Sequence, residues 1–432
     1  MSKTTILGRR GFIAHGGGWA LAGLVHCTGA PVEARSAQGA AQGADADRTT
    51  ATFADRAGRV LAAYDAQGLH RTATEADRES AEWLRHEAAR AGGAARLERF
   101  ALERLDVHAA FVELGGRRIE GLPFFDGGAT SDAGAVGPIG PTSIHLAIAN
   151  RAAIGSEGAF LAEVRRGNAR AVVVVTEGDR PGLVPSNARA FAAPYGCAVV
   201  QVASDARAAL EAAERAGSDV RVVCHTTRTT SEALNVVAEV PGRTATLAPL
   251  VVITPRSGWW QCAAERGGGI VCWLEAIRAL AGTPPDRPAI FVASSGHELG
   301  HLGLEAFLHA NEALSSTAHA WIHLGANIGA GAPDDPPVGV RLQASHDALE
   351  QRMTNALSAT GAPMAGRLPR GQVPAGEARN LHLGGARYVS LLGQGNRWFH
   401  HPDDRYPRTI TDSLVTRYAQ AVARAVSELA RA

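Results

Sequence analysis

Acidic, imidazole and guanidinium side chains gather in four short segments of the chain. The segments are PRSGWW at 255–260, AERGGG at 264–269, SGHELGH at 295–301 and RWFHHPDD at 397–404. Carboxylate and imidazole groups bind zinc in proteins, and they also carry protons in general acid–base catalysis. Each of these residues taken alone is as well explained by a salt bridge, a solvated loop or a satisfied polar group in the core. The chemistry therefore depends on whether the fold brings the segments together.

Hydrophobic runs place most of these segments at the ends of predicted strands. We expect strands at 250–254, 289–293, 320–324 and 388–392, with helices at 270–280, at 303–314 and from 412 onward. Alternating strands and helices predict an α/β fold of three layers, with a largely parallel sheet covered on both faces. Ligands bind beyond the carboxyl ends of the strands in such sheets, so the predicted site lies there.

The middle of the chain predicts a smaller α/β unit set inside the larger one. Strands are expected at 143–148, 171–176 and 198–202, with helices at 157–168 and 205–217. We therefore assign 135–230 to an inserted domain, and 51–134 together with 231–432 to the larger domain. Two further helices are expected near 52–68 and 74–91, where Gly92 and Gly93 end the second one.

Composition and charge exclude several classes of protein. With 43 Lys and Arg against 42 Asp and Glu, the chain lacks the basic excess of a nucleic-acid-binding protein. A mean hydropathy of -0.05 excludes a polytopic membrane protein. The 5 cysteines are too few and too scattered for a disulfide scaffold, and none forms a CxxC pair that would indicate a zinc ribbon.

The first 36 residues predict an export signal. Arg9 and Arg10, followed by Phe12 and a mildly apolar stretch, are typical of a twin-arginine leader. The apolar stretch is too short to span a bilayer, so we expect no stable membrane span. A disordered basic tail is the alternative. Residues 37–50 are rich in Ala, Gly and Gln and predict a linker. The expected location is the periplasm or the medium.

The order of the four segments resembles that of the zinc aminopeptidases and their glutaminyl-cyclase and transferrin-receptor relatives, which form metallopeptidase clan MH. The likeness covers nearly the whole mature chain. It implies a mostly parallel mixed sheet of the aminopeptidase type. It also implies that 135–230 is similar to the protease-associated domain inserted in many of these proteins.

Active members of this family hold two zinc ions, and the resemblance implies that one of the two sites is lost here. Arg256 and Gly258 stand where the His and the Asp of a His-x-Asp motif are expected after the first core strand. Gly325 or Ala326 stands where a later Asp is expected. The ligands that would bind only this one of the two zinc ions are therefore missing.

The resemblance also implies that the second zinc site is retained. Glu265 stands at the position of the bridging carboxylate, Glu298 at the second Glu of a Glu-Glu pair, and His400 at the C-terminal His. Two carboxylates and one imidazole with an open position suit a catalytic zinc. We therefore expect one zinc per chain, and we leave open whether His301 or His401 replaces one of these ligands.

Two residues are candidates for catalysis. His297 occupies the position where active relatives keep a proton-accepting Glu, and a neutral imidazole could take a proton from a zinc-bound water at neutral pH. Arg256 could stand in for the missing ion, because a guanidinium donates two hydrogen bonds to a carbonyl or carboxylate group. The alternative for Arg256 is a structural salt bridge with an acid such as Glu265.

A second motif overlaps the first. Residues 297–301 spell HELGH, which on a helix would place two His side chains on one face with the Glu as general base. The preceding residues predict strand and loop, and Gly300 weakens a helix, so this interpretation is the less favoured one.

Three functions follow from these observations. The first is an exported single-zinc hydrolase or acyl-transfer enzyme acting on a peptide or a small-molecule amide. The second is a catalytically inactive aminopeptidase-like binding protein, which would not need Glu265, Glu298 and His400 to converge. The third is an HExxH-type metalloprotease.

Overall fold

The computed structural model describes residues 52–150, 168–194, 196–333 and 337–431. The predicted leader and linker, and nearly all of the predicted helix at 157–168, lie outside these ranges. Within them, none of the helices combines the length and the apolar character that crossing a membrane requires. The described residues belong to one compact unit.

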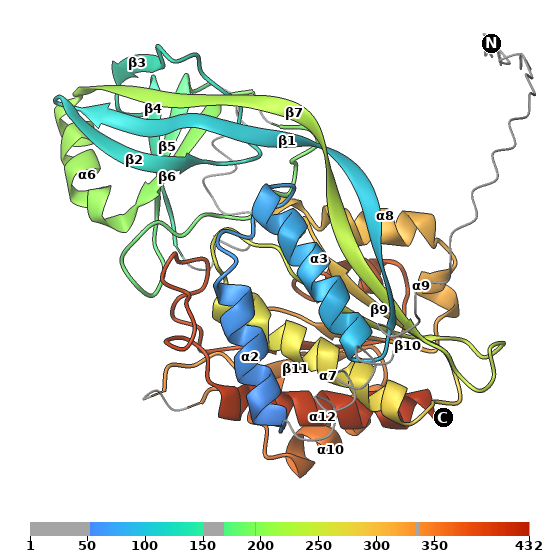
Figure 1. The fold of residues 1–432 in the computed structure, drawn as a ribbon. Coiled ribbons are helices and arrows are strands. Elements are labelled where there is room, and N and C mark those ends of the chain that lie inside the picture. Colours follow the sequence, from blue (N-terminus) through green and yellow to red (C-terminus); the bar gives the residue numbers. More distant parts are fainter. Residues whose placement is uncertain (1–51, 151–167, 195, 334–336, 432) are drawn as a thin grey trace, which may run out of the picture. The chain divides into compact units, whose positions relative to one another are not determined.

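One mixed sheet runs through the described residues (Figure 1). From one edge to the other its strands are β12 (Met364–Arg367), β11 (Val340–Ala344), β13 (Tyr388–Gly393), β10 (Ala320–Leu324), β8 (Leu250–Pro255), β9 (Ala289–Ser294), β7 (Asp219–Val240), β1 (Ala94–Leu114), β2 (Arg117–Pro123), β6 (Ala198–Ala203), β5 (Ala171–Thr176) and β4 (Ile144–Ala149), and β3 (Ala135–Pro138) pairs with β7. The central strands β13, β10, β8 and β9 are parallel, whereas β7 joins β9 in antiparallel fashion.

Helices cover both faces of the central strands, as the three-layer prediction requires. One hydrophobic core joins the sheet to α2 (Phe53–Asp65), α3 (Glu75–Arg90), α7 (Gly268–Gly282), α10 (Asp347–Ala359) and α12 (Asp412–Ala430). A second core joins the other face to α8 (Leu302–Ala310) and α11 (Ala378–Leu383). Successive side chains of a strand point to opposite faces, so Val252 packs in the first core and Val251 in the second.

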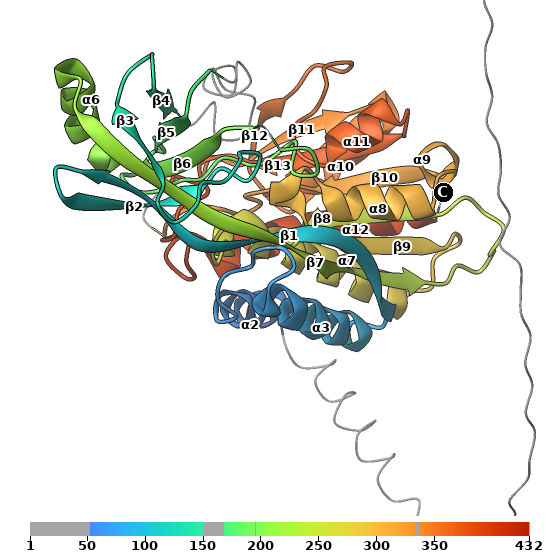
Figure 2. The same cartoon turned by 90° about the horizontal axis from the view of Figure 1, so that it is seen from above.

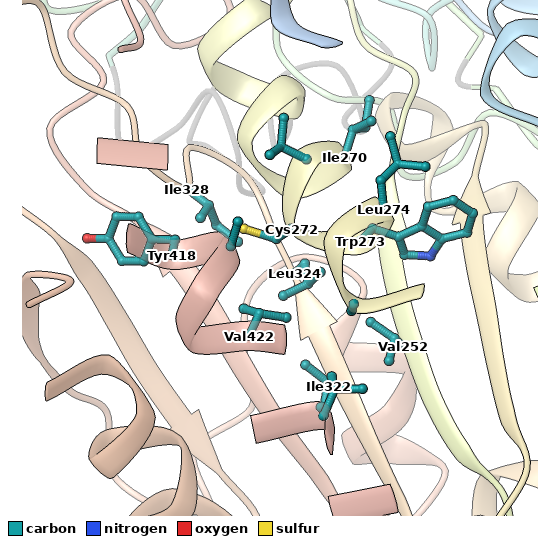
Figure 3. Packing of buried hydrophobic residues seen from close by; sticks show 14 of the residues in the cluster. Val252, Ile270, Cys272, Trp273, Leu274, Ile322, Leu324, Ile328, Tyr418 and Val422 are labelled. Carbon is teal, nitrogen blue, oxygen red and sulfur yellow. The ribbon is translucent and has the colours of Figure 1, made fainter. Parts of the chain in front are cut away.

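The first core is built mainly from α7 and α12 against the sheet (Figure 3). Ile270 and Trp273 of α7 and Tyr418 of α12 belong to the same buried cluster as Val252 and Ile322 on the strands. All five side chains are fully buried. At roughly 1.5–3 kcal/mol for each large apolar side chain removed from water, this layer holds the strand ends in place.

Two long antiparallel strands, β1 and β7, extend from the central sheet into the predicted inserted unit (Figure 2). They pair from Ala94 opposite Glu239 to Leu114 opposite Val220, with one irregularity near Val107. Beyond them β2 pairs with β6, and β4, β5 and β6 form a small parallel group with a core of their own.

The predicted strands of the insert are therefore present, but the structure shows no separate inserted domain. They continue the same sheet, because β1 and β7 are 21 and 22 residues long and belong to both parts. The sequence prediction also left out β11, β12 and α10, which form the far edge of the sheet.

Candidate functional site

The strand-end segments surround one buried polar region. The loop after β8 holds Arg256 and Ser257, and the loop after β9 holds His297 and Glu298. A single π-helical turn, Ala263–Gly267, precedes α7 and carries Glu265 and Arg266. The loop after β13 carries His400. All of these strands end at the same edge of the sheet because β8, β9 and β13 run in parallel with β10.

Glu265, Arg266 and His400 form a compact ion cluster. Glu265 Oε1 lies 2.7 Å from Arg266 Nη2 and 3.4 Å from His400 Nε2. The three side chains are at most 1% exposed. Arg266 also donates from Nε to the carbonyl of Ser257 at 2.7 Å, which directs its guanidinium toward Glu265.

Charge keeps Glu265 ionised in this dry environment. Burial alone would raise the pKa of Glu265, but the guanidinium of Arg266, followed by His400, lowers it to about 2. Burial lowers the pKa of Arg266, yet Glu265 and then other nearby groups, Glu298 among them, raise it above its usual value. Arg266 therefore stays protonated, and both Glu265 and Glu298, the carboxylates of the predicted zinc site, stabilise its charge.

The backbone around Glu265 is held by a buried carboxylate, Asp404. Its two oxygens accept the backbone N–H groups of Ala264 and Glu265, each at 2.9 Å. The hydroxyl of Thr409 donates to the same carboxylate at 2.7 Å. Burial raises the pKa of Asp404 to about 6. Asp404 lies in the fourth segment named above, but its sequence position does not indicate that it fixes the turn carrying Glu265.

Glu298 belongs to a separate network. Its Oε1 accepts the backbone N–H and the hydroxyl of Thr72 at 2.9 and 2.6 Å, and its Oε2 accepts the hydroxyl of Ser257 at 2.6 Å. The same two hydroxyls also accept the backbone N–H of Gly296, each at 2.9 Å. These hydrogen bonds therefore hold the loop after β9, which carries Glu298, against the loop before α3, which carries Thr72.

This network predicts a moderate stability effect for Thr72→Val. The change keeps the shape of the side chain but removes one donor to a buried carboxylate, so we expect a loss of about 2 kcal/mol in the free energy of unfolding. Urea unfolding monitored by circular dichroism measures it. Thr230→Val is the control, because the Thr230 hydroxyl bonds Glu103 on the exposed surface. Equal stability of the two variants would mean that Thr72 does not hold Glu298.

His297, the predicted general base, is buried beside Glu377. Its Nδ1 lies 3.7 Å from Glu377 Oε1, which also accepts the hydroxyl of Ser294 at 2.5 Å. Burial first, and then Arg266 and His301, lower the pKa of His297 well below its usual value. The imidazole is therefore neutral at pH 7, and it is a weaker base than an ordinary histidine. The sequence interpretation did not identify Glu377.

Arg256, the other predicted catalytic residue, has a different set of partners. Its Nη1 lies 2.8 Å from Asp77 Oδ1 and donates to the Asp77 carbonyl at 2.9 Å, and its Nη2 donates to the Leu234 carbonyl at 2.5 Å. Arg256 and Asp77 are at most 1% exposed. The predicted alternative of a structural ion pair thus describes its surroundings, with Asp77 in place of Glu265 as the acid.

The HELGH string does not lie on a helix. His297–Leu299 is a single 3-10 turn, and His301 has a φ of 69°, in the left-handed region. The helix α8 begins only at Leu302. The Nδ1–H group of His301 instead donates to Asn380 Oδ1 at 2.8 Å. The two histidines therefore do not share a helical face, which is the arrangement that the HExxH interpretation requires, although their ring centroids lie 4.9 Å apart.

A loop from the far part of the sheet, residues 181–189, covers the strand ends, and we call it the closing loop. It is joined to three strand-end segments by hydrogen bonds. These pairs are Pro181 O with His401 Nε2 at 2.9 Å, Pro185 O with His400 Nδ1 at 2.7 Å, Asn187 Oδ1 with Trp259 Nε1 at 2.9 Å, and the backbone N–H of Ala188 with Glu298 O at 2.8 Å.

The donor set does not fit the predicted three-ligand zinc. His400 and Glu265 face one another and would suit a metal, since Pro185 fixes the His400 tautomer and leaves Nε2 with a free lone pair. Glu298, however, already accepts three hydrogen bonds. A guanidinium 2.7 Å from Glu265 also repels a cation. In the parts of the chain that the structure describes, no three His, Cys, Asp or Glu side chains are grouped so that they could hold a metal ion.

The fold is shared with solved zinc aminopeptidases. A zinc aminopeptidase from Bacillus subtilis matches with a TM-score of 0.72 and 16% identity, over 88% of this chain and 95% of that one. A peptidase M28 precursor from Shewanella amazonensis matches with 0.71 and 16%, over 91% and 97%. An aminopeptidase from an Aneurinibacillus strain matches with 0.64 and 16%, over 88% and 94%. No family model and no curated protein matches the sequence. The predicted resemblance is therefore confirmed at the level of the fold.

Proposed function

We propose that this chain is a ligand-binding protein built on the zinc-aminopeptidase fold and that it does not hydrolyse peptides. One observation carries the proposal. The carboxylate that the resemblance assigns to the retained zinc, Glu265, is paired with the buried guanidinium of Arg266 at 2.7 Å. A permanent cation at this distance neutralises the charge that a metal ion would otherwise neutralise.

Two further observations support this proposal. Glu298 accepts three hydrogen bonds from Thr72 and Ser257, so only one of its about four lone-pair sites, on Oε2, is left for a metal ion. The closing loop also leaves Glu265, Arg266 and His400 at most 1% exposed. A peptide bond could approach them only if this loop moved away, and that would break its bonds to three strand-end segments.

The second candidate is the single-zinc hydrolase, and His400 favours it. A metal-binding histidine usually donates its other ring N–H to a carbonyl, as Nδ1 does here toward Pro185 at 2.7 Å. In that function Glu265 and His400 would provide two of the ligands, and zinc would supply a Lewis acid for a substrate carbonyl. His297 would remain neutral and could accept a proton. Export through the leader stays a prediction for either function.

Metal content and turnover of the purified full-length chain distinguish the two candidates. After incubation with zinc and removal of excess ion, we expect well below one zinc per chain by mass spectrometry. We also expect no zinc-dependent turnover of aminoacyl anilides, dipeptides, esters or N-terminal glutamine. The matched variants are His400→Ala and His301→Ala. One zinc per chain that is lost in His400→Ala and kept in His301→Ala, together with turnover, would replace the binding function with the single-zinc enzyme.

A further inference from the structure

We propose that a cavity bordered by Glu298 and Trp259 binds a small monocarboxylate that carries an aromatic or branched apolar group. This inference rests on the proposed ligand-binding function and names the class of ligand. The cavity measures about 220 Å³. Its lining includes Arg71, Leu105, Val107, Phe125, Trp259 and Glu298. Ligand pockets for drug-sized molecules are roughly 300–1,000 Å³, so the ligand here is smaller.

One wall of the cavity is apolar and rigid. Phe125 and Trp259 meet edge to face with ring centroids 4.9 Å apart, and Leu299 packs in the same cluster. Leu105 and Val107 of β1 add aliphatic surface beside them. The indole N–H of Trp259 is already donated to Asn187, so the ring offers only its apolar surface. This wall suits a flat ring or a branched alkyl group.

Most charged groups around the cavity are paired with protein partners. Arg104 Nε donates to Asp106 Oδ1 at 2.7 Å, and the hydroxyl of Thr229 donates to Asp106 Oδ2 at 2.6 Å. The hydrogen bond from Arg104, and then the one from Thr229, lowers the pKa of Asp106 and keeps its carboxylate ionised. Glu298 accepts the three hydrogen bonds from Thr72 and Ser257 described above. Arg104, Asp106 and Glu298 therefore have protein partners and do not require a hydrogen bond from a ligand.

Arg71 is the exception among the lining residues. Its guanidinium makes no hydrogen bond or ion pair within the described residues, although it is partly buried in the cavity wall. Burial lowers the pKa of Arg71, and the more distant charge of Glu298 opposes that effect. A guanidinium that is partly withdrawn from water and has no protein partner can gain two parallel hydrogen bonds from a planar carboxylate.

The apolar wall and the Arg71 guanidinium lie in the same cavity, and together they indicate the class of ligand. The carboxylate binds Arg71, and the apolar part of the ligand packs against Phe125 and Trp259. A neutral ligand of the same shape would leave the Arg71 guanidinium unpaired. A dicarboxylate would place its second charge against the apolar wall or near Glu298.

Isothermal titration of the full-length chain with two probes, 3-phenylpropanoate and 3-methylbutanoate, tests the inference. We expect at least one to bind with one site per chain, and its neutral amide to bind at least about tenfold more weakly, which is the effect of one charge-assisted contact. Arg71→Gln should cost a similar factor. Val107→Trp, which fills the cavity and leaves every charge in place, should abolish binding.

Arg78→Gln is the matched control, because Arg78 lies outside the lining and pairs with Glu75 on the surface of α3. It should bind both probes as the unchanged protein does. Failure of the unchanged protein to bind either probe overturns the inference, and so does equal affinity for acid and amide. Unchanged affinity in Arg71→Gln also overturns it. None of these results changes metal content or turnover, so failure here is distinguishable from failure of the proposed function.

Discussion

Replacing Arg266 by methionine is expected to lower the free energy of unfolding by about 3–5 kcal/mol, which is the effect of removing one partner from a buried ion pair. Methionine fills a similar volume but carries no charge. The Glu265 carboxylate, 2.7 Å from the lost guanidinium, would remain in a site shielded from water. Denaturant unfolding of the full-length chain at pH 7 gives this difference directly.

Two comparisons decide whether the ion pair is responsible. In Arg266→Met with Glu265→Gln, the uncompensated charge is gone as well, so much of the lost stability should return. Arg99→Met removes an arginine whose partner Glu232 is on the surface, with side chains 72% and 56% exposed, and should change little. An Arg266→Met protein as stable as Arg99→Met would mean that Glu265 does not depend on the guanidinium.

The free energy of unfolding is also expected to fall by about 3 kcal/mol per pH unit as the pH drops from 6.5 to 5. Burial lowers the pKa of His70 to about 3 and that of His323 to about 4, and it lowers the pKa of His297 well below its usual value. These three side chains bind protons near pH 6.5 only when the chain unfolds. Their contribution to stability is therefore complete above pH 6.5 and is lost below it.

Burial also lowers the pKa of His319, whereas two carboxyl groups act in the opposite direction, since burial raises the pKa of Asp77 and of Asp404. The pKa of Asp404 is raised to about 6 by burial, so the folded chain takes up one proton there before the unfolded chain does. The net excess of about two protons in the unfolded state sets the slope. His323→Gln should reduce the slope by about 1.4 kcal/mol per pH unit, whereas His309→Gln, an exposed histidine, should leave it unchanged. A flat stability profile between pH 7 and 5 would contradict the expectation.

The strands that carry the site could be predicted because their residues have a strong local signal. The run of valines in β5 and the apolar runs of β8, β9, β10 and β13 are buried on both faces. Such runs are typical of parallel strands between helices. By contrast β11 contains the polar residues Arg341 and Gln343, and β12 contains Gly366 and Arg367, so neither forms an apolar run.

The site was predicted only in part, because its contacts join residues that are far apart in the chain. Thr72 and Glu298 are separated by 226 positions and Asp77 and Arg256 by 179. No local pattern indicates either pair. Arg266 is adjacent to Glu265, but only the π-helical turn at Ala263–Gly267 directs both side chains into one cluster. A sequence pattern can name residue types that bind zinc, whereas the structure determines which of them are already occupied.

The shared ribbon of β1 and β7 limits how the chain could be recombined with relatives. A chimera joined at residue 230 would cut β7 in the middle of a continuous strand, Asp219–Val240, beside Glu103 on its partner. The grafted half would then have to recreate a ladder register that its new neighbour does not encode. A transferable module would have to carry both strands of the ribbon complete, and the closing loop with it, since that loop contacts the strand ends of the recipient.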